Sequence, residues 1–176
     1  MIESQVCLAG MSSAALHLFV AIAFIARHPL RTLAIRWDSI AALPSVAISG
    51  VAVQLARPQL QWPICNQIGF VLGVTLTAIA LWHLGRSFAV LPNGRPIITR
   101  GFYRFIRHPM YFGELLMVAA CCSVDFTWYT TGLMIPAVAA VMFRIIAEER
   151  ALRRFDERGF SRYAASVRWR LIPLVW

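Results

Sequence analysis

Long apolar runs recur along this chain, and they restrict its fold more than any other feature of the sequence. A helix that crosses a lipid bilayer needs about 20 mostly apolar residues. Only 14% of the residues are charged, against roughly 25% in soluble domains. The sequence therefore predicts an all-α integral membrane protein with five transmembrane helices in a single domain over residues 1–176. The expected spans are at about 6–26, 39–56, 64–84, 109–124 and 129–147.

Three of these runs carry further local signals. No basic residue precedes the first run and no small-residue cleavage site is obvious, so it is expected to stay as a span and not to act as a signal peptide. In the third run, Gly69 and Gly73 have the spacing of a helix-packing motif, which we expect to serve packing within the monomer. The fourth run begins with Pro109, which suits the first position of a helix.

The distribution of arginine predicts the orientation of the helices. All 17 basic residues are Arg, and cytoplasmic loops are rich in basic residues. With the N-terminus outside, the cytoplasmic segments 27–38, 85–107 and 144–176 hold every Arg except Arg57. Because these residues flank apolar runs, we expect contacts with anionic lipid headgroups and not with nucleic acid. The expected location is a bacterial inner membrane, with the site facing the cytosol.

The C-terminal segment is expected to form an amphipathic helix over residues 148–170, lying in the membrane interface on the cytoplasmic side. Apolar or small residues recur there at steps of three to four, and arginines fill many of the other positions. The apolar face comprises Leu152, Phe155, Gly159, Tyr163 and Val167. The four histidines are scattered without the spacing of metal ligands, and no metal site is predicted.

Two groups of ionisable residues lie near the ends of the expected spans. Arg144 and Glu148 are four residues apart and share one helical face. The stretch GFYRFIRHPMYFGE, residues 101–114, offers a helix start that favours an anion and tyrosine faces that attract a cation. Within it, Glu114 needs a partner such as an Arg or a bound amine. The structural alternatives are a salt bridge at a helix end and an interfacial belt of aromatic and arginine residues.

Two later segments extend the pattern, RIIAEERAL at 144–152 and YAASVRWRLIP at 163–173. In this order, the three segments resemble the isoprenylcysteine carboxyl methyltransferase family and the related phospholipid N-methyltransferases. The resemblance covers roughly residues 82–173. It implies a membrane enzyme that uses S-adenosylmethionine, held in a cytosol-facing pocket that the loop 85–107 and the C-terminal helix close.

The resemblance also implies roles for individual residues. Glu148 would meet the cofactor and Arg144 would face the methyl acceptor, so these two are the candidate catalytic residues. The other cofactor-binding residues would be Arg95, Pro96, Ile97, Ile98, Tyr103, His108, Pro109, Met110 and Tyr111. One departure is that Asp156 and Glu157 stand where the family has Phe-Gly, so the tail is expected to pack differently.

The acceptor is expected to be lipophilic or lipid-anchored, with membrane lipids as partners, and its reacting group stays open. Methyl transfer from a sulfonium is an in-line displacement that depends mainly on positioning. Arg144 could hold a carboxylate, whereas Glu148 could accept a proton from a thiol or an amine. Two other functions are alternatives: an NADPH-dependent membrane reductase, because sterol reductases have a similar Arg-His-Pro-x-Tyr-x-Gly-Glu element, and a non-catalytic membrane subunit. The oligomeric state is left open.

Overall fold

A computed structural model describes residues 47–48, 50–52, 62–85, 96–124 and 126–176. Within these residues there is no β-strand, and a single isolated parallel bridge joins Ile106 to Trp169. The described part of the chain is therefore all-helical, as predicted. The span expected at 6–26 and most of the span expected at 39–56 lie outside it. Its helices are α4 (Ile64–Leu84), the 3-10 helix η2 (Gly101–Arg104), α5 (Pro109–Cys122), α6 (Trp128–Gly132), α7 (Met134–Phe155) and α8 (Glu157–Ser166).

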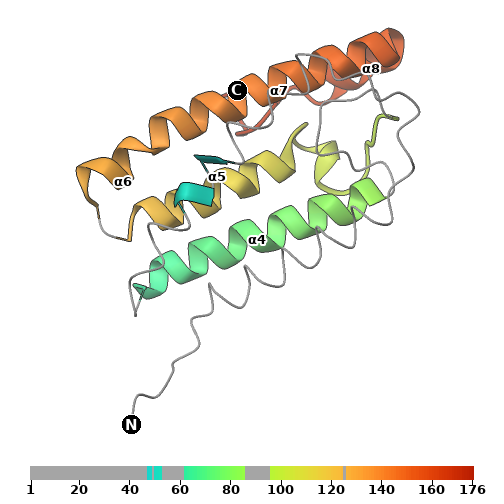
Figure 1. Ribbon diagram of the computed structural model, residues 1–176. Coiled ribbons are helices and arrows are strands. Elements are labelled where there is room, and N and C mark those ends of the chain that lie inside the picture. The colour runs from blue at the N-terminus through green and yellow to red at the C-terminus, as the bar shows by residue number, and fades with distance from the viewer. Residues whose placement is uncertain (1–46, 49, 53–61, 86–95, 125) are drawn as a thin grey trace.

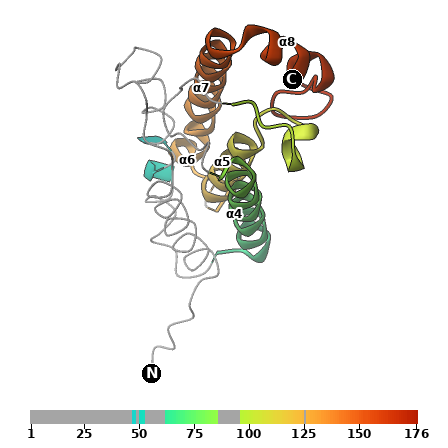
Figure 2. The same cartoon turned by 90° about the vertical axis from the view of Figure 1, so that its right-hand side faces the viewer.

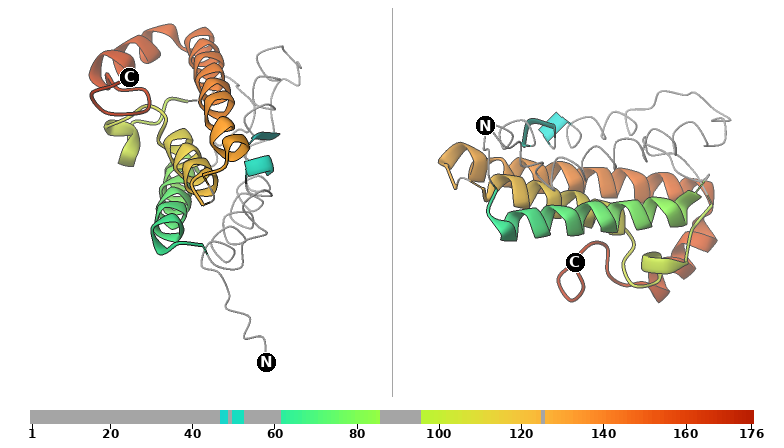
Figure 3. Two further views of the ribbon diagram at one scale, coloured as in Figure 1. Left: turned by 90° about the vertical axis from the view of Figure 1, so that its left-hand side faces the viewer. Right: turned by 90° about the horizontal axis from the view of Figure 1, so that it is seen from below.

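The helices α4, α5 and α7 run alongside one another, with α5 packed against both of the others (Figure 1). Helix α8 turns back from the end of α7, and its Tyr163 reaches η2 (Figure 2). Seen from below, α8, η2 and the C-terminus gather at the same side of the three helices (Figure 3). The C-terminal segment and the loop before α5 are therefore neighbours, although about 60 residues separate them in sequence.

Two helical stretches in the described residues are long and apolar enough to cross a membrane, Ile64–Leu84 and Trp128–Phe155. The first has the predicted bounds: it starts directly after Pro63 and ends before Gly85, whose φ of 50° suits glycine. Helix α5 starts at Pro109 as predicted, but at Cys122 it ends two residues before the expected limit. It is a shorter apolar helix, Pro109–Cys122.

Glycine residues allow α4 and α5 to approach at backbone distance. A Cβ atom added at Gly73 would lie 2.7 Å from the carbonyl oxygen of Gly113 in α5. A Cβ atom added at Gly113 would clash with the hydroxyl of Thr77 in α4. Gly69 would meet only the side chain of Ala120, at an ordinary 3.7 Å. Gly73 therefore serves packing within the monomer, as the sequence predicts, and its partner is Gly113.

We expect Gly73→Ala to destabilise the protein by about 1–3 kcal/mol, because a methyl group forced into a filled contact displaces backbone. A lower thermal midpoint in detergent would measure this loss. Gly132→Ala is the matched control, since nothing lies within 4 Å of the added Cβ. Equal midpoints for the two variants would contradict the close approach.

The C-terminal helix differs from the prediction. Helix α7 continues to Phe155, and α8 covers only Glu157–Ser166, so a single helix over 148–170 is wrong. The break is at Asp156, whose backbone is extended and whose carboxylate accepts a hydrogen bond from the N–H of Gly159 at 2.9 Å. An Asp in this position caps a new helix. The departure from the Phe-Gly pattern of the family thus coincides with the turn between α7 and α8.

The buried face of the tail is also partly different from the one expected. Of the residues expected on its apolar face, Leu152, Tyr163 and Val167 are buried within the protein, but Phe155 is 59% exposed. Phe160, only 1% exposed, takes the buried position because α8 starts with a new helical phase after the break.

Candidate active site

The start of α5 is held in place by the C-terminal segment. The backbone N–H of His108 donates to the carbonyl oxygen of Arg170 at 2.9 Å, and that of Arg107 donates to Trp169 at 2.9 Å. Together with the bridge from Ile106 to Trp169, these bonds lay residues 169–170 along residues 106–108. The position of the His-Pro motif therefore depends on residues far along the chain.

Tyr111 lies at the centre of a buried cluster between α5 and α7. Its hydroxyl donates a hydrogen bond to Glu148 Oε2 at 2.7 Å. The guanidinium carbon of Arg144 lies 4.7 Å from the centroid of its ring. The ring of His108 stacks on it, with centroids 5.6 Å apart. Four residues that the sequence marks as functional thus meet at one aromatic ring, and all four are buried.

Arg144 also contacts a second carboxylate. Its Nη1 atom lies 3.4 Å from Glu114 Oε2, and the two side chains are 6% and 14% exposed. Arg144 interacts electrostatically with Glu148 as well, one turn along its own helix. Glu114 therefore has the arginine partner that the sequence indicated it needs, and this partner comes from α7.

Glu149 organises the other side of His108, a role that sequence reasoning missed. Its Oε1 atom lies 2.8 Å from Nη1 of Arg107 and 3.5 Å from Nε2 of His108. The Nε atom of Arg170 donates to both carboxylate oxygens at 3.2 Å. Glu149 is 4% exposed. The sequence signal that could have revealed it is that Glu149 directly follows Glu148 in an arginine-rich segment.

Arg107 is the main link between the motif and the tail. Its guanidinium donates to Glu149 and also to the carbonyl oxygens of Val167 at 2.7 Å and Arg168 at 3.1 Å. The side chain is only 11% exposed. A guanidinium can satisfy several acceptors in a fixed geometry, so Arg107 closes the end of α8 against the start of α5.

A narrow cavity adjoins this cluster beneath the loop before α5. The hydroxyl of Tyr163 donates to the carbonyl oxygen of Tyr103 at 2.7 Å, which ties α8 to η2 across one wall. The cavity is apolar on most sides, and His108 links it to the cluster around Tyr111. Its lining residues are Ile97, Ile98, Tyr103, Arg107, His108, Leu152, Phe160 and Tyr163.

The structure places most of the expected site residues together. Ile97, Ile98, Tyr103 and His108 surround the cavity, and His108, Tyr111, Arg144 and Glu148 form the adjoining cluster. Pro109 is fully buried, and Met110 packs between the two regions. Pro96 is exposed in the described loop, and Arg95 lies outside the described residues.

A second cavity lies between α4, α5 and α6, towards the other end of the helices. Apolar atoms dominate its walls, which include Cys65, Leu116 and Met134. None of the expected site residues lines it. Its polar residue Asn66 is already bonded to the carbonyl oxygen of Ala120 at 2.9 Å. The chemistry therefore concentrates at the end of the molecule that carries the tail.

The arrangement suits a ligand that carries positive charge and an apolar part. Tyrosine faces attract a cation, and buried carboxylates accept hydrogen bonds from its N–H groups. The apolar walls exclude water, which strengthens these interactions. In the described residues, no group of His, Cys, Asp and Glu side chains is arranged to hold a metal ion.

Comparison with known proteins connects this site to a family. The sequence model of the isoprenylcysteine carboxyl methyltransferase family matches residues 65–154, just over half of the chain. The matched region contains the loop, the His-Pro motif and the Arg144–Glu149 segment. No curated protein matches the chain.

Proposed function

The chain belongs to the isoprenylcysteine carboxyl methyltransferase family of membrane methyltransferases, and we propose that it moves a methyl group from S-adenosylmethionine to a lipophilic or lipid-anchored acceptor. The observation that carries this proposal is the buried cluster of Tyr111, Arg144 and Glu148, which His108 joins to the loop-side cavity, a space of about 10 Å³ in this structure. The aromatic faces of Tyr103, Phe160 and Tyr163 in the cavity wall suit a sulfonium cofactor. Its amine would reach the carboxylate of Glu148, which lies in the adjoining cluster and not in the cavity wall.

Each candidate residue has a part in this proposal. Ile97, Ile98 and Tyr103 would hold the apolar and ring portions of the cofactor, together with Pro109 and Met110. The loop residues Arg95 and Pro96 would extend this pocket. His108 and Tyr111 would place their rings beside its charged part, and Glu148 would accept hydrogen bonds from it. When bound, the cofactor supplies an electrophilic methyl group on a sulfonium.

The chain's own residues would then position the acceptor and exclude water. Displacement at a methyl group needs the attacking atom in line with the leaving sulfur. Arg144 lies over the ring of Tyr111, Glu148 accepts a hydrogen bond from its hydroxyl, and both are buried, so both can orient an acceptor at this residue. A lipid-anchored molecule could present its head group here while its tail stays in the bilayer.

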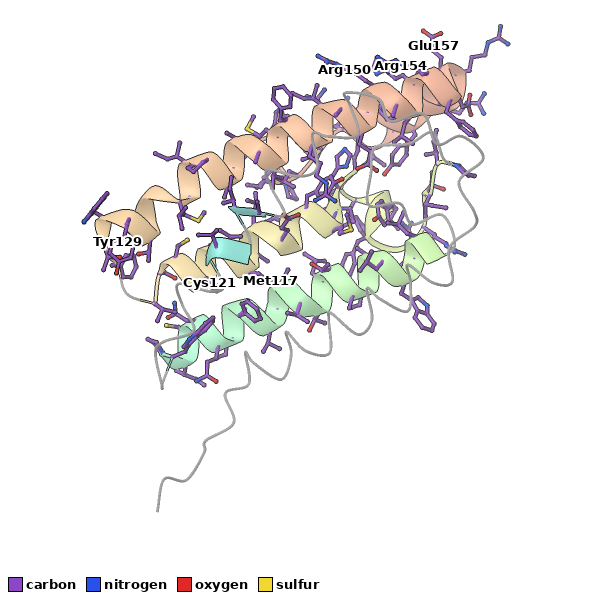
Figure 4. All side chains as sticks on the ribbon, viewed as in Figure 1. Met117, Cys121, Tyr129, Arg150, Arg154 and Glu157 are labelled. Carbon is purple, nitrogen blue, oxygen red and sulfur yellow. The ribbon has the colours of Figure 1, made fainter. Side chains whose placement is uncertain are left out.

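We also propose the membrane arrangement expected from the sequence, as a single domain with five spans, the N-terminus outside and the site facing the cytosol of a bacterial cell. The arginines of the described residues support it, because they concentrate at the end of the molecule that carries the site. Arg150 and Arg154 lie towards this end of α7, whereas Tyr129 lies at the opposite end (Figure 4). Basic residues on the cytoplasmic side are the rule for membrane proteins.

Calorimetry on the purified protein tests the proposed function. We expect saturable binding of S-adenosylmethionine and of its demethylated product, with no binding of NADPH. Binding of NADPH alone would support the reductase suggested by the Gly113-Glu114 element. Binding of neither compound by folded protein would favour a non-catalytic membrane subunit.

A further inference from the structure

The C-terminal end of α4 is tied to the segment before η2 by an arginine that lies 17 residues further along the chain. The Nε and Nη2 atoms of Arg100 donate to the carbonyl oxygen of His83 at 3.2 and 3.1 Å. The last four carbonyl groups of a helix have no partner within it, and a positive charge is favourable at this end of the helix dipole. Arg100 therefore completes the end of α4 and holds the chain around residue 100 against it.

The ring of His83 forms the second half of this attachment. Its Nδ1 atom lies 2.7 Å from the carbonyl oxygen of Ile79. A carbonyl oxygen only accepts, so Nδ1 carries the proton of this bond, and the bond fixes the ring on α4. Gly101 packs directly against the ring, where an added Cβ atom would clash with it. The φ of Gly101 is 61°, which glycine adopts without steric cost. We call His83, Arg100 and Gly101 the α4 clamp.

The loop part of the α4 clamp lies between two residues that line the candidate cofactor cavity. Ile98 precedes Arg100 in the chain, and Tyr103 follows Gly101. Both pack with buried residues near the end of α4, which are Ala80, Leu81 and Leu84. The carbonyl oxygen of Tyr103 also accepts the hydrogen bond from Tyr163 of α8. The clamp thus holds one wall of the cavity on α4, and α8 contacts the same wall.

The size of the cavity makes the position of this wall important. The space measures about 10 Å³, whereas sites for small molecules occupy about 300–1,000 Å³, so part of the wall has to move when a cofactor enters. A wall that is already ordered loses little conformational freedom on binding, which raises the affinity. Because it holds Ile98 and Tyr103 on α4, the clamp lowers this cost on the loop side of the site.

From this geometry we propose that His83 and Arg100 are positioning residues for the methyl donor, an inference that rests on the proposed function. Both lie outside the set of described residues that line the cavity, so they act through Ile98 and Tyr103 and not by touching the cofactor. The buried cluster around Tyr111 lies between α5 and α7. Loss of the clamp should therefore weaken binding of the methyl donor while this cluster stays folded.

Hydrogen exchange of the protein without cofactor tests the clamp itself. The backbone N–H groups of Phe105 and Ile106 both bond to the carbonyl oxygen of Phe102, at 3.0 and 3.1 Å, so their exchange reports the opening of η2. We expect His83→Ala and Arg100→Ala to speed this exchange about 5-fold or more. Mass spectrometry of peptides from the detergent-solubilised protein would measure it.

The matched controls remove exposed side chains from the same two elements. Trp82→Ala replaces a residue of α4 that is 73% exposed, and Arg104→Ala replaces an exposed arginine of η2. Neither should change the exchange. Gly101→Ala should speed the exchange more in the native background than in the His83→Ala background, because the added methyl group clashes with the ring of His83.

Calorimetry with S-adenosylmethionine tests the positioning role. We expect the affinity of His83→Ala and of Arg100→Ala to fall about 10-fold, because the wall must then be ordered on binding. Two conservative variants should recover part of this affinity. His83→Phe keeps a flat ring against Gly101, and Arg100→Lys keeps one charged donor for the carbonyl oxygen at the end of α4.

The outcomes separate this inference from the function on which it rests. Unchanged exchange in both alanine variants would show that the clamp does not hold η2. Unchanged or tighter binding of S-adenosylmethionine despite faster exchange would show that the clamp does not position the donor. Either result would overturn the inference and leave the proposed function in place. Failure of the unmodified, folded protein to bind S-adenosylmethionine would overturn the proposed function, and the inference with it.

Discussion

Replacing Arg107 with alanine is expected to abolish methyl transfer and to destabilise the protein by about 3–5 kcal/mol, the cost of breaking one partner out of a buried ion pair. The guanidinium bonds to Glu149 at 2.8 Å and to the carbonyl oxygens of Val167 and Arg168. Its loss takes from buried Glu149 the shortest of its ion pairs, leaving Arg170 and His108 beside it, and removes a donor from the carbonyl oxygens of Val167 and Arg168. Thermal unfolding in detergent and calorimetry with S-adenosylmethionine would measure the two effects separately.

Two companion variants identify the cause. Arg107→Lys should recover little, because an ammonium group cannot reach several acceptors with the fork geometry of a guanidinium. Arg104→Ala is the matched control, since Arg104 is exposed and its recorded contact is with the ring of Phe105, 5.5 Å away. Equal thermal midpoints and equal affinities for S-adenosylmethionine in Arg107→Ala and Arg104→Ala would contradict the prediction. The position of the C-terminal segment would then not depend on Arg107.

The helices that bear the site could be predicted because their signals are local. The bounds of α4 follow from an apolar run between Pro63 and Gly85, and the start of α5 follows from Pro109. Both signals act within a few residues, through the fixed φ of proline and the conformational freedom of glycine. The break at Asp156 was missed, since the same arginine-rich periodicity continues on both sides of it.

The partners within the site depend on how helices cross, which spacing along one helix does not determine. The four-residue spacing of Arg144 and Glu148 correctly placed both on one face. However, the closest recorded partner of Glu148 is the hydroxyl of Tyr111, and the carboxylate recorded nearest to Arg144 belongs to Glu114. Both partners come from α5. Spacing therefore placed both residues on one face of the helix, and the packing of α5 on α7 decided their contacts.

The role of Glu149 required two segments that are distant in sequence. Its partners Arg107 and Arg170 lie 42 and 21 residues away, and His108 reaches it only because the tail runs beside residues 106–108. No periodicity of the sequence links these positions. The segment after Ser166 forms no helix, and its backbone bonds to residues 107–108 are what bring Arg170 into place.

Glu148→Gln is expected to lower kcat by about 100-fold or more for an acceptor that must lose a proton, such as a thiol or an amine, because this is the usual contribution of a general base; the fold should persist. The amide keeps the shape of the side chain. Its oxygen can still accept the hydrogen bond from Tyr111, which is 2.7 Å long in the unmodified protein. Single-turnover transfer of a labelled methyl group would measure the chemical step, and calorimetry would measure the affinity for S-adenosylmethionine independently of it.

The comparison with Tyr111→Phe separates proton transfer from binding at the same place. This variant keeps the ring beneath Arg144, 4.7 Å from its guanidinium carbon, and removes only the hydroxyl, so we expect a smaller loss, about 10-fold. A carboxylate acceptor needs no base, and for it Glu148→Gln should change the cofactor affinity more than kcat. A group that contacts the cofactor and takes a proton cannot be neutralised without effect. If Glu148→Gln changed neither kcat nor the affinity for S-adenosylmethionine with any acceptor, Glu148 would therefore be a structural carboxylate at the end of a span.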